Sequence, residues 1–209
     1  MRPHGILLVF AVALTGCSST LPPMLQEPRE VPVEGTYTHR PSKIAFPPAI
    51  NKFSRIQVMQ FDAIGETTSV IYKSAAPACS VTATLTIYVA PGHVPIEPLP
   101  SAAEEAKTIL VHEHFNALKK AILQSEPHAK LLAEEETTLF QAGGAKRGRR
   151  GLFEYEDTMT QQSVRADLYL FILGKWALKY RFVYSAAAET CASAAVNDFL
   201  LAFSWPRTS

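Results

Sequence analysis

The regular alternation of side chains along residues 81–89 constrains the fold of this chain more than any other feature. Val81 begins a series in which every second residue is apolar, and three threonines and Tyr88 fill the positions between. Successive side chains on a strand point to opposite faces of a sheet, so this period of two predicts a strand with one face in the core. Residues 176–184 alternate in the same way and follow Gly174-Lys175, a pair typical of a two-residue hairpin turn. The chain should therefore contain an antiparallel sheet.

Other periodic segments complete the expected architecture. Ser101 and Glu104 form a capping box, which favours a helix from there to about residue 123. A second helix is expected at 187–203, and residues 130–141 fit a strand at their ends but a solvated helix face in their middle. Further strands are expected at 56–61, 69–73, 152–155 and 164–173. We therefore expect one α+β domain over residues 49–209, with an antiparallel sheet of about six to seven strands covered by two main helices.

The composition agrees with a single globular domain. The chain has 209 residues, of which 47% are hydrophobic, enough to bury one core of ordinary size. Its 20 basic residues nearly cancel its 19 acidic ones. Because no excess of positive charge draws the chain onto phosphate backbones, nucleic acid is not an expected partner.

The first 17 residues carry an export signal. Arg2 precedes an apolar run of 10 residues, from Gly5 to Leu14. This run is shorter than the roughly 20 apolar residues of a membrane-spanning helix. The run ends in Leu14-Thr15-Gly16-Cys17, which resembles the lipobox of bacterial lipoproteins. An ordinary secretory signal or an anchor helix is the alternative.

The lipoprotein resemblance has specific consequences. It implies that residues 1–16 are a cleaved signal peptide and that Cys17 carries the lipid, so that acyl chains hold the protein on the membrane. Ser18, in place of an aspartate, implies sorting to the outer membrane, facing the periplasm, rather than retention in the inner membrane. The expected location is thus the bacterial cell envelope.

Residues 17–48 are expected to form a tether between the lipid and the domain. This stretch contains seven of the 15 prolines and no apolar period, which favours an extended, semi-rigid spacer of up to about 90 Å. The alternative is that its second half docks on the domain through Tyr37, Ile44 and Phe46. The prolines are Pro22, Pro23, Pro28, Pro32, Pro41, Pro47 and Pro48.

A second resemblance concerns the C-terminal part. The segment 174–184, followed by a helix and Ser204-Trp205-Pro206, resembles the end of a group of uncharacterised bacterial secreted proteins. With the order of elements added, residues 50–206 are similar at the level of the fold to the photosystem extrinsic (PsbP-like) proteins. This similarity implies a fold and no activity, because one fold can carry many functions.

Two cysteines are left once Cys17 is assigned to the lipid. Cys79 precedes the clearest strand and Cys191 lies near the start of the last helix. In an oxidising compartment the two can form one disulfide bond, and the alternative is two separate buried thiols.

The histidine motif does not indicate a metal site. His112 and His114 are two residues apart, so a helix points them to different faces, and Phe115 stands where a zinc protease would have its second histidine. No set of ligands with metal-binding spacing is present in the sequence. We expect neither a metal nor another cofactor.

A cluster of cations is the main candidate for contact with a ligand. Lys146, Arg147, Arg149 and Arg150 lie within five residues of a glycine-rich segment that we expect to be a flexible loop. Such a loop would attract lipid headgroups, peptidoglycan or an acidic envelope protein. The alternative is a solvated loop without a partner.

Two classes of function fit these features. The first is a non-enzymatic, lipid-anchored envelope domain that binds or supports another component, since no catalytic motif is found in the sequence. The second is an envelope hydrolase or transferase with a scattered site, for which Asp62, Glu66 and Asp167 are the candidate residues. A deep pocket with converging acids and histidines would favour the enzyme.

Overall fold

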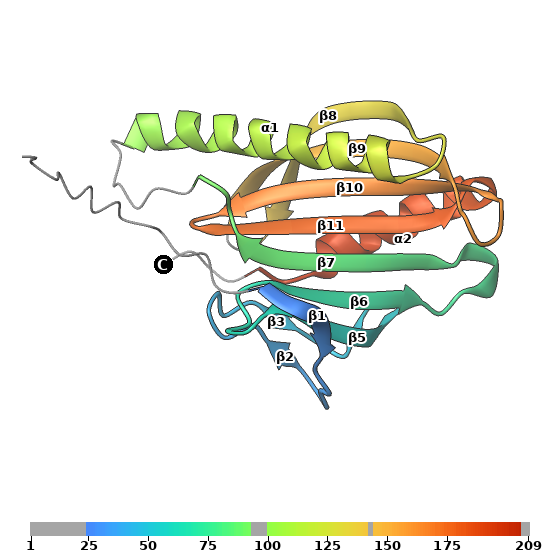
Figure 1. Cartoon of the computed structure of the whole chain (residues 1–209), viewed down its shortest axis with the longest axis horizontal. Coiled ribbons are helices and arrows are strands. Elements are labelled where there is room, and N and C mark those ends of the chain that lie inside the picture. Colours follow the sequence, from blue (N-terminus) through green and yellow to red (C-terminus); the bar gives the residue numbers. More distant parts are fainter. Residues whose placement is uncertain (1–23, 93–99, 142–143, 206–209) are drawn as a thin grey trace, which may run out of the picture.

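The computed structural model describes residues 24–92, 100–141 and 144–205 (Figure 1). The expected signal peptide at 1–16 and the expected lipid attachment site at Cys17 lie outside the described residues. No helix in this part of the chain is long and apolar enough to cross a membrane.

One large antiparallel sheet forms the centre of the molecule. Within the described ranges it has nine strands, in the order β1-β5-β6-β7-β11-β10-β9-β8, with β4 paired to β5. The strands are β1 (Met24–Glu30), β4 (Ala49–Ile50), β5 (Phe53–Asp62), β6 (Thr68–Ser74), β7 (Val81–Val89), β8 (Lys130–Gln141), β9 (Gly144–Glu156), β10 (Ser163–Leu173) and β11 (Trp176–Ser185). A separate pair joins β2 (Tyr37–Thr38) to β3 (Ala45–Phe46).

Two helices and two short 3-10 turns complete the fold. The long helix α1 (Pro100–Ser125) follows β7, and α2 (Glu189–Ala202) follows β11 after the turn η2 (Ala186–Ala188). The turn η1 (Pro77–Cys79) precedes β7. Both helices were expected close to these bounds.

The predicted fold class is wrong in the number of strands and in how much of the domain the sheet makes up. The sequence predicted six to seven strands beneath two main helices, whereas the described residues give a nine-stranded sheet that dominates the domain. The segment between Lys146 and Gly151 contains no apolar residue, so the alternation that reveals a buried strand is missing there. The short strand β4 and the proline-containing β1 gave no such signal either.

The two helices lie on opposite faces of the sheet (Figure 1). Val111, Phe115 and Ile122 of α1 pack with Leu168 and Leu170 of β10. Gly151 permits this packing, since a Cβ atom at that position would lie 2.8 Å from the Phe115 ring. The face of the sheet beneath α1 is thus a smaller apolar core.

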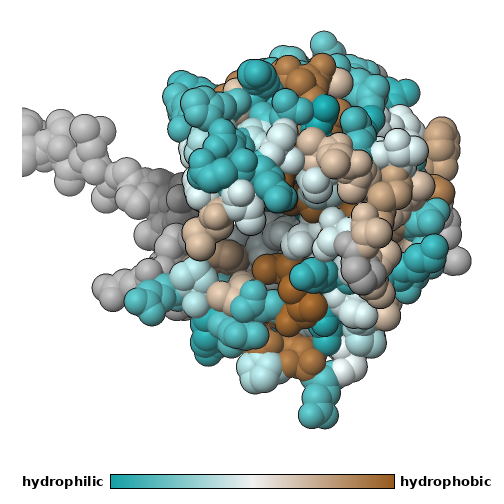
Figure 2. Space-filling model, turned by 90° about the vertical axis from the view of Figure 1, so that its right-hand side faces the viewer, coloured by the Kyte–Doolittle hydropathy of each residue, from teal (hydrophilic) through white to brown (hydrophobic). Residues whose placement is uncertain are grey.

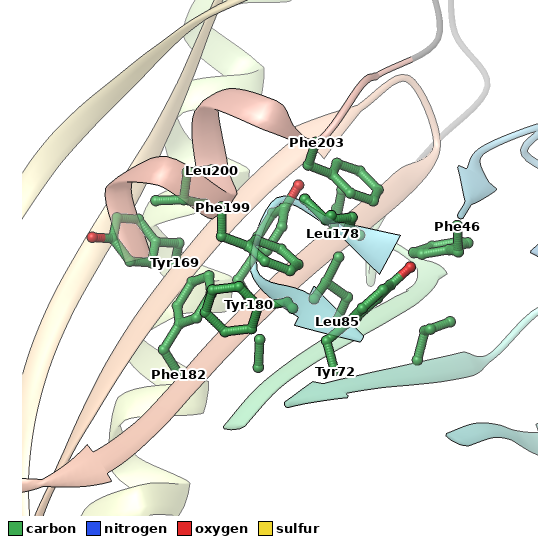
Figure 3. Close-up of a cluster of buried hydrophobic side chains, with 14 of the residues drawn as sticks. Phe46, Tyr72, Leu85, Tyr169, Leu178, Tyr180, Phe182, Phe199, Leu200 and Phe203 are labelled. Carbon is green, nitrogen blue, oxygen red and sulfur yellow. The ribbon is translucent and has the colours of Figure 1, made fainter. Parts of the chain in front are cut away.

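The larger core lies on the α2 face and is rich in aromatic rings (Figure 3). Phe199 of α2 contacts Phe53, Tyr72 and Phe182 in edge-to-face geometry, with ring centroids 4.9 to 5.5 Å apart. Tyr180, on β11, is fully buried in the same cluster. Such ring pairs add about 0.5–1.5 kcal/mol each beyond the area that they bury.

Much of the segment expected to be a tether belongs to the domain. Strand β1 pairs with β5, and Ile44 and Phe46 are buried in the larger core, with Tyr37 packed against it. The Arg55 guanidinium donates hydrogen bonds to the carbonyl oxygens of Phe46 and Val33. The docked arrangement, which was the alternative for this segment, is therefore the one that the structure shows from Met24 onward.

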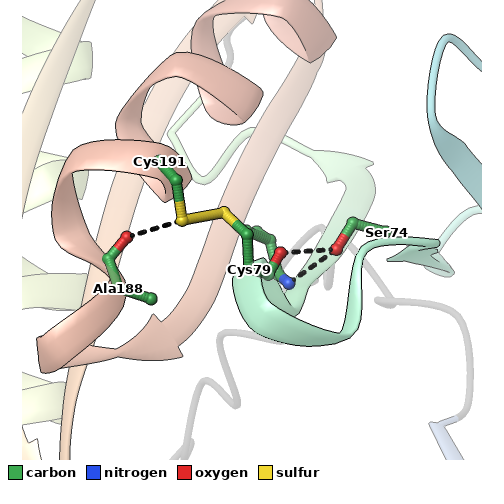
Figure 4. The surroundings of a disulfide bond; sticks show 5 residues. Ser74, Cys79, Ala188 and Cys191 are labelled. Atoms are coloured by element: carbon green, nitrogen blue, oxygen red, sulfur yellow. Dashed lines mark hydrogen bonds between the residues drawn. A yellow bond between two sulfur atoms is a disulfide. The ribbon is translucent and has the colours of Figure 1, made fainter.

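A disulfide bond joins Cys79 and Cys191, so the bonded alternative for these cysteines is the one found (Figure 4). It ties the loop before β7 to α2 across 112 residues of sequence, with the two Cα atoms 6.1 Å apart. Ser74 braces this loop, because its hydroxyl donates to the Cys79 carbonyl oxygen and accepts from the Val81 amide.

Candidate functional site

A groove of about 370 Å³ lies between α1 and the β8–β9 hairpin. Helix α1 contributes the wall on one side, and the two paired strands contribute the other. The lining residues are Lys107, Thr108 and Val111 from α1, Glu136, Thr137 and Thr138 from β8, and Arg147, Gly148 and Arg149 from β9. We call this site the α1 groove.

The register of the hairpin explains why cations reach the α1 groove. Arg147 and Arg149 are two residues apart on β9, so their side chains share a face of the sheet. The Arg149 guanidinium carbon lies 5.8 Å from the centre of the Phe115 ring on α1, which identifies this face as the one beneath the helix. Thr138 is paired with Arg147 across the strands and adds a hydroxyl on the same face.

Salt bridges hold Arg149 in place beside the groove. Glu134 accepts a hydrogen bond from Lys119 of α1 and another from Arg149, each with a nitrogen–oxygen distance of 2.6 Å. The Lys119 contact, followed by the Arg149 contact, lowers the pKa of the Glu134 carboxyl despite the opposing effect of burial. One carboxylate therefore neutralises only half of the charge of these two cations.

The lining of the α1 groove is positive overall. The lining contains three basic residues, Lys107, Arg147 and Arg149, and one acid, Glu136. Arg147 is exposed and has no salt bridge within the described parts of the chain. It is therefore available to a ligand.

The four cations of the sequence cluster do not share a flexible loop. Residues 144–156 form strand β9, and the alternation of that strand sends Lys146 and Arg150 to the face opposite Arg147 and Arg149. Lys146 is buried, with 8% of its surface exposed. The expectation that the four cations lie together on a flexible loop is thus wrong, because β9 pairs with β8 along the whole segment that contains them.

Arg150 has a structural role on the α2 face. Its guanidinium donates to both carboxylate oxygens of Asp167, at 2.7 and 2.9 Å, and to Glu135 at 2.8 Å. The Asp167 hydrogen bonds are the main cause that raises the pKa of Arg150. Since its charge is already balanced, Arg150 is not a candidate for ligand contact.

The three acids named for an enzyme are not brought together. Asp62 accepts hydrogen bonds from the backbone amides of Ile64, Glu66 and Thr67, and so closes the turn between β5 and β6. Glu66 lies 3.7 Å from the Lys175 amine, and Asp167 is bound by Arg150. Across the described ranges no group of three or more histidines, cysteines or acids could hold a metal ion.

The two histidines of α1 have separate partners. The His112 ring contacts the Asn116 amide at 3.0 Å, whereas the His114 ring contacts the Tyr88 hydroxyl of β7. Burial, with a smaller effect of the Lys179 charge, lowers the pKa of His114. As expected from their spacing, the two rings do not point to one ligand.

Sequence reasoning identified Arg147 and Arg149 but missed the rest of the α1 groove. Lys107 and Thr108 occur in an ordinary amphipathic helix, and Thr137 and Thr138 lie in the segment that was ambiguous between helix and strand. The pairing of β8 with β9 brings these residues together. In the sequence, the adjacent Thr137 and Thr138 could have indicated a strand in this segment, because threonine favours strands.

Comparison with known proteins identifies a fold and no family. No protein-family model and no curated protein sequence matches the chain. A solved structure from Pseudomonas aeruginosa is similar: it belongs to a protein of unknown function for which a regulatory role has been suggested. The TM-score is 0.52 at 10% identity, over 75% of this chain and 99% of that one. At this identity the likeness shows the fold alone.

Proposed function

We propose that this protein is a lipid-anchored component of the bacterial cell envelope whose domain binds an anionic ligand in the α1 groove, without catalysis. The observation that carries the proposal is the excess of positive charge in that groove, with Arg147 exposed and unpaired within the described parts of the chain. The expected location is the periplasmic side of the outer membrane.

The size and chemistry of the α1 groove support a small anionic group as the ligand. Its volume of about 370 Å³ lies within the range of small-molecule sites, roughly 300–1,000 Å³. An arginine guanidinium can donate two parallel hydrogen bonds to a carboxylate or a phosphate. Thr138 places a hydroxyl on the same face as Arg147, and Val111 adds an apolar contact.

The arrangement of acids supports binding over catalysis. A hydrolase or transferase needs acid, base or nucleophile groups that converge on one reacting atom. Asp62 and Glu66 share the turn between β5 and β6, where Asp62 caps backbone amides, whereas Asp167 lies on β10 and is bound by Arg150. The α1 groove contains a single acid, Glu136.

The lipobox cysteine and the disulfide bond both support a location in the cell envelope. The Leu14-Thr15-Gly16-Cys17 sequence has the residues of a lipobox in order. The Cys79–Cys191 disulfide is of the kind that persists in oxidising compartments such as the periplasm. Both features agree with an exported chain that is anchored by its N-terminal cysteine.

Titration of the domain from Ser18 onward with glycerol phosphate and with a carboxylate-bearing peptidoglycan fragment tests the binding proposal. Replacing Arg147 with glutamine should weaken binding of at least one probe by about tenfold, since a hydrogen bond to a charged group contributes about 1.5–3 kcal/mol. Arg40→Gln is the matched control, because Arg40 is exposed on the arm that contains β2 and β3. An equal effect of both variants, or no binding of either probe, would contradict the proposal.

A further inference from the structure

Three loops gather at one end of the sheet, on the left of Figure 1, and we call this the turn end. They are residues 63–67 between β5 and β6, residues 90–92 after β7, and residues 174–175 between β10 and β11. The Ala90 amide donates to the Lys175 carbonyl oxygen at 2.8 Å, and the Lys175 amine lies 3.7 Å from Glu66. These contacts make the turn end one connected surface.

The N-terminal arm is fixed to the same end. The His39 ring, fully buried, bonds the Gly65 carbonyl oxygen at 2.8 Å and meets the Trp176 ring edge-on. Strand β1 starts here as well, because Met24 is the partner of Asp62 in the pairing with β5. The chain therefore enters the described domain at the turn end.

The distance from Cys17 to Met24 limits how the domain can stand on a membrane. Met24 lies seven positions after Cys17, and a fully extended chain over seven steps spans at most about 25 Å. The turn end must therefore lie within about 25 Å of any lipid attached at Cys17. This reach is much shorter than that of the 32-residue tether expected from the sequence.

The opposite end of the sheet lies too far away to face the same membrane. Strand β10 has 11 residues, so the loop that contains Met159 is about 35 Å from the turn end. If that loop touched the bilayer with the strands standing upright on it, Met24 would be about 35 Å from the surface, farther than the chain can reach. Figure 2 shows this opposite end, where hydrophobic residues gather in the lower centre among hydrophilic ones. Surface hydrophobicity therefore does not indicate which end of the sheet faces the membrane. The length of the chain between Cys17 and Met24 does.

The exposed side chains of the turn end fit a headgroup region. Ile64 is 62% exposed at the tip of the first loop and offers an apolar contact. The Lys175 side chain is 47% exposed, and its amine lies 4.8 Å from the centre of the Trp176 ring. Trp176 is buried, so the exposed groups of the turn end are the Lys175 amine, which suits anionic headgroups, and the Ile64 side chain, which suits the apolar side of the boundary.

We infer that the turn end lies against the phospholipid headgroups and that the Met159 loop points away from the membrane. This orientation rests on the proposed attachment of lipid at Cys17. It also directs the opposite end toward the interior of the compartment, where a partner can reach it.

Depth-dependent quenching of tryptophan fluorescence tests the orientation. The mature chain from Cys17 is coupled through that thiol to maleimide lipids in vesicles of brominated phospholipid, since Cys79 and Cys191 are joined to each other and do not react. One variant carries Ile64→Trp and the matched control carries Met159→Trp, both at exposed positions, so the native tryptophans contribute equally to each.

The account predicts strong quenching of the added fluorescence in the Ile64→Trp variant and almost none in the Met159→Trp variant. Equal quenching, or stronger quenching of the Met159→Trp variant, would overturn the orientation. Thermal unfolding of both variants confirms that the fold is kept. Because the lipid is attached chemically, this result does not depend on lipidation in the cell, and a failure of the proposed anchor is detected separately by the mass of the protein.

Discussion

Asp167 and Arg150 form a two-fold hydrogen-bonded ion pair between neighbouring strands, with the carboxylate 1% exposed and the arginine side chain 30% exposed. Removing one partner of such a pair leaves the other charge buried, which is costly. The pair therefore stabilises the fold on the α2 face of β9 and β10, and it is not a binding site.

Replacing Arg150 with alanine should lower the free energy of unfolding by about 2–3 kcal/mol, somewhat below the range for a fully buried pair because the arginine is partly solvated. Glu135→Gln is the matched control: Glu135 binds the same arginine but is 56% exposed, so its loss should cost less than about 1 kcal/mol. Urea denaturation of both variants checks the difference. Equal losses of unfolding free energy in the two variants would show that the buried Asp167 carboxylate does not need Arg150 as its partner.

His39 should make the docking of the N-terminal arm depend on pH. The ring is fully buried, and burial lowers its pKa from the ordinary value of 6.5. Because the unfolded chain takes up the proton more readily, the stability that neutral His39 provides is complete above about pH 6.5 and is lost as the pH falls toward its folded-state pKa.

Urea denaturation of the wild type and of His39→Gln across about pH 7 to 5 measures this dependence. The variant should be less stable at the upper pH but lose less stability on acidification. The pKa of His114, which is half-buried, is also lowered, so His114→Gln is the control for a second histidine of this kind. If His39→Gln keeps the full pH dependence of the wild type, the arm is not the pH-sensitive element.

The disulfide should contribute strongly to stability. In the chain-entropy description, a bond that closes a loop of 112 residues stabilises the fold by about 4–5 kcal/mol. Replacing both Cys79 and Cys191 with serine should therefore lower the denaturation midpoint clearly, and a reducing agent should shift the wild type in the same direction. A reductant that shifts the double variant equally would show that the effect comes from another source.

Sequence reasoning was most successful where one face of an element is apolar. The alternation that starts at Val81 and the one at 176–184 correspond to β7 and β11, and the capping box at Ser101 lies at the start of α1. For the two strands, the local pattern and the tertiary burial agree, since the apolar positions of each strand lie in the core.

Prediction from the sequence failed for strands that are joined by ion pairs between their side chains. The hairpin of β8 and β9 carries glutamates opposite arginines, such as Glu135 opposite Arg150, so polar cross-strand contacts replace the apolar stripe. The docking of the N-terminal arm was predicted only as the alternative to a tether, because Ile44 and Phe46 are isolated among prolines and find their partners only in the folded core. The α1 groove depends on the first of these, the pairing of β8 with β9 beneath α1.

The claim that this is an anchored envelope protein is tested most directly at Cys17. The mature wild type should have lost residues 1–16, carry the mass of acyl chains and fractionate with membranes, whereas Cys17→Ala should be released from them. Unchanged membrane fractionation of Cys17→Ala, together with the mass of the full-length precursor in both forms, would contradict the account.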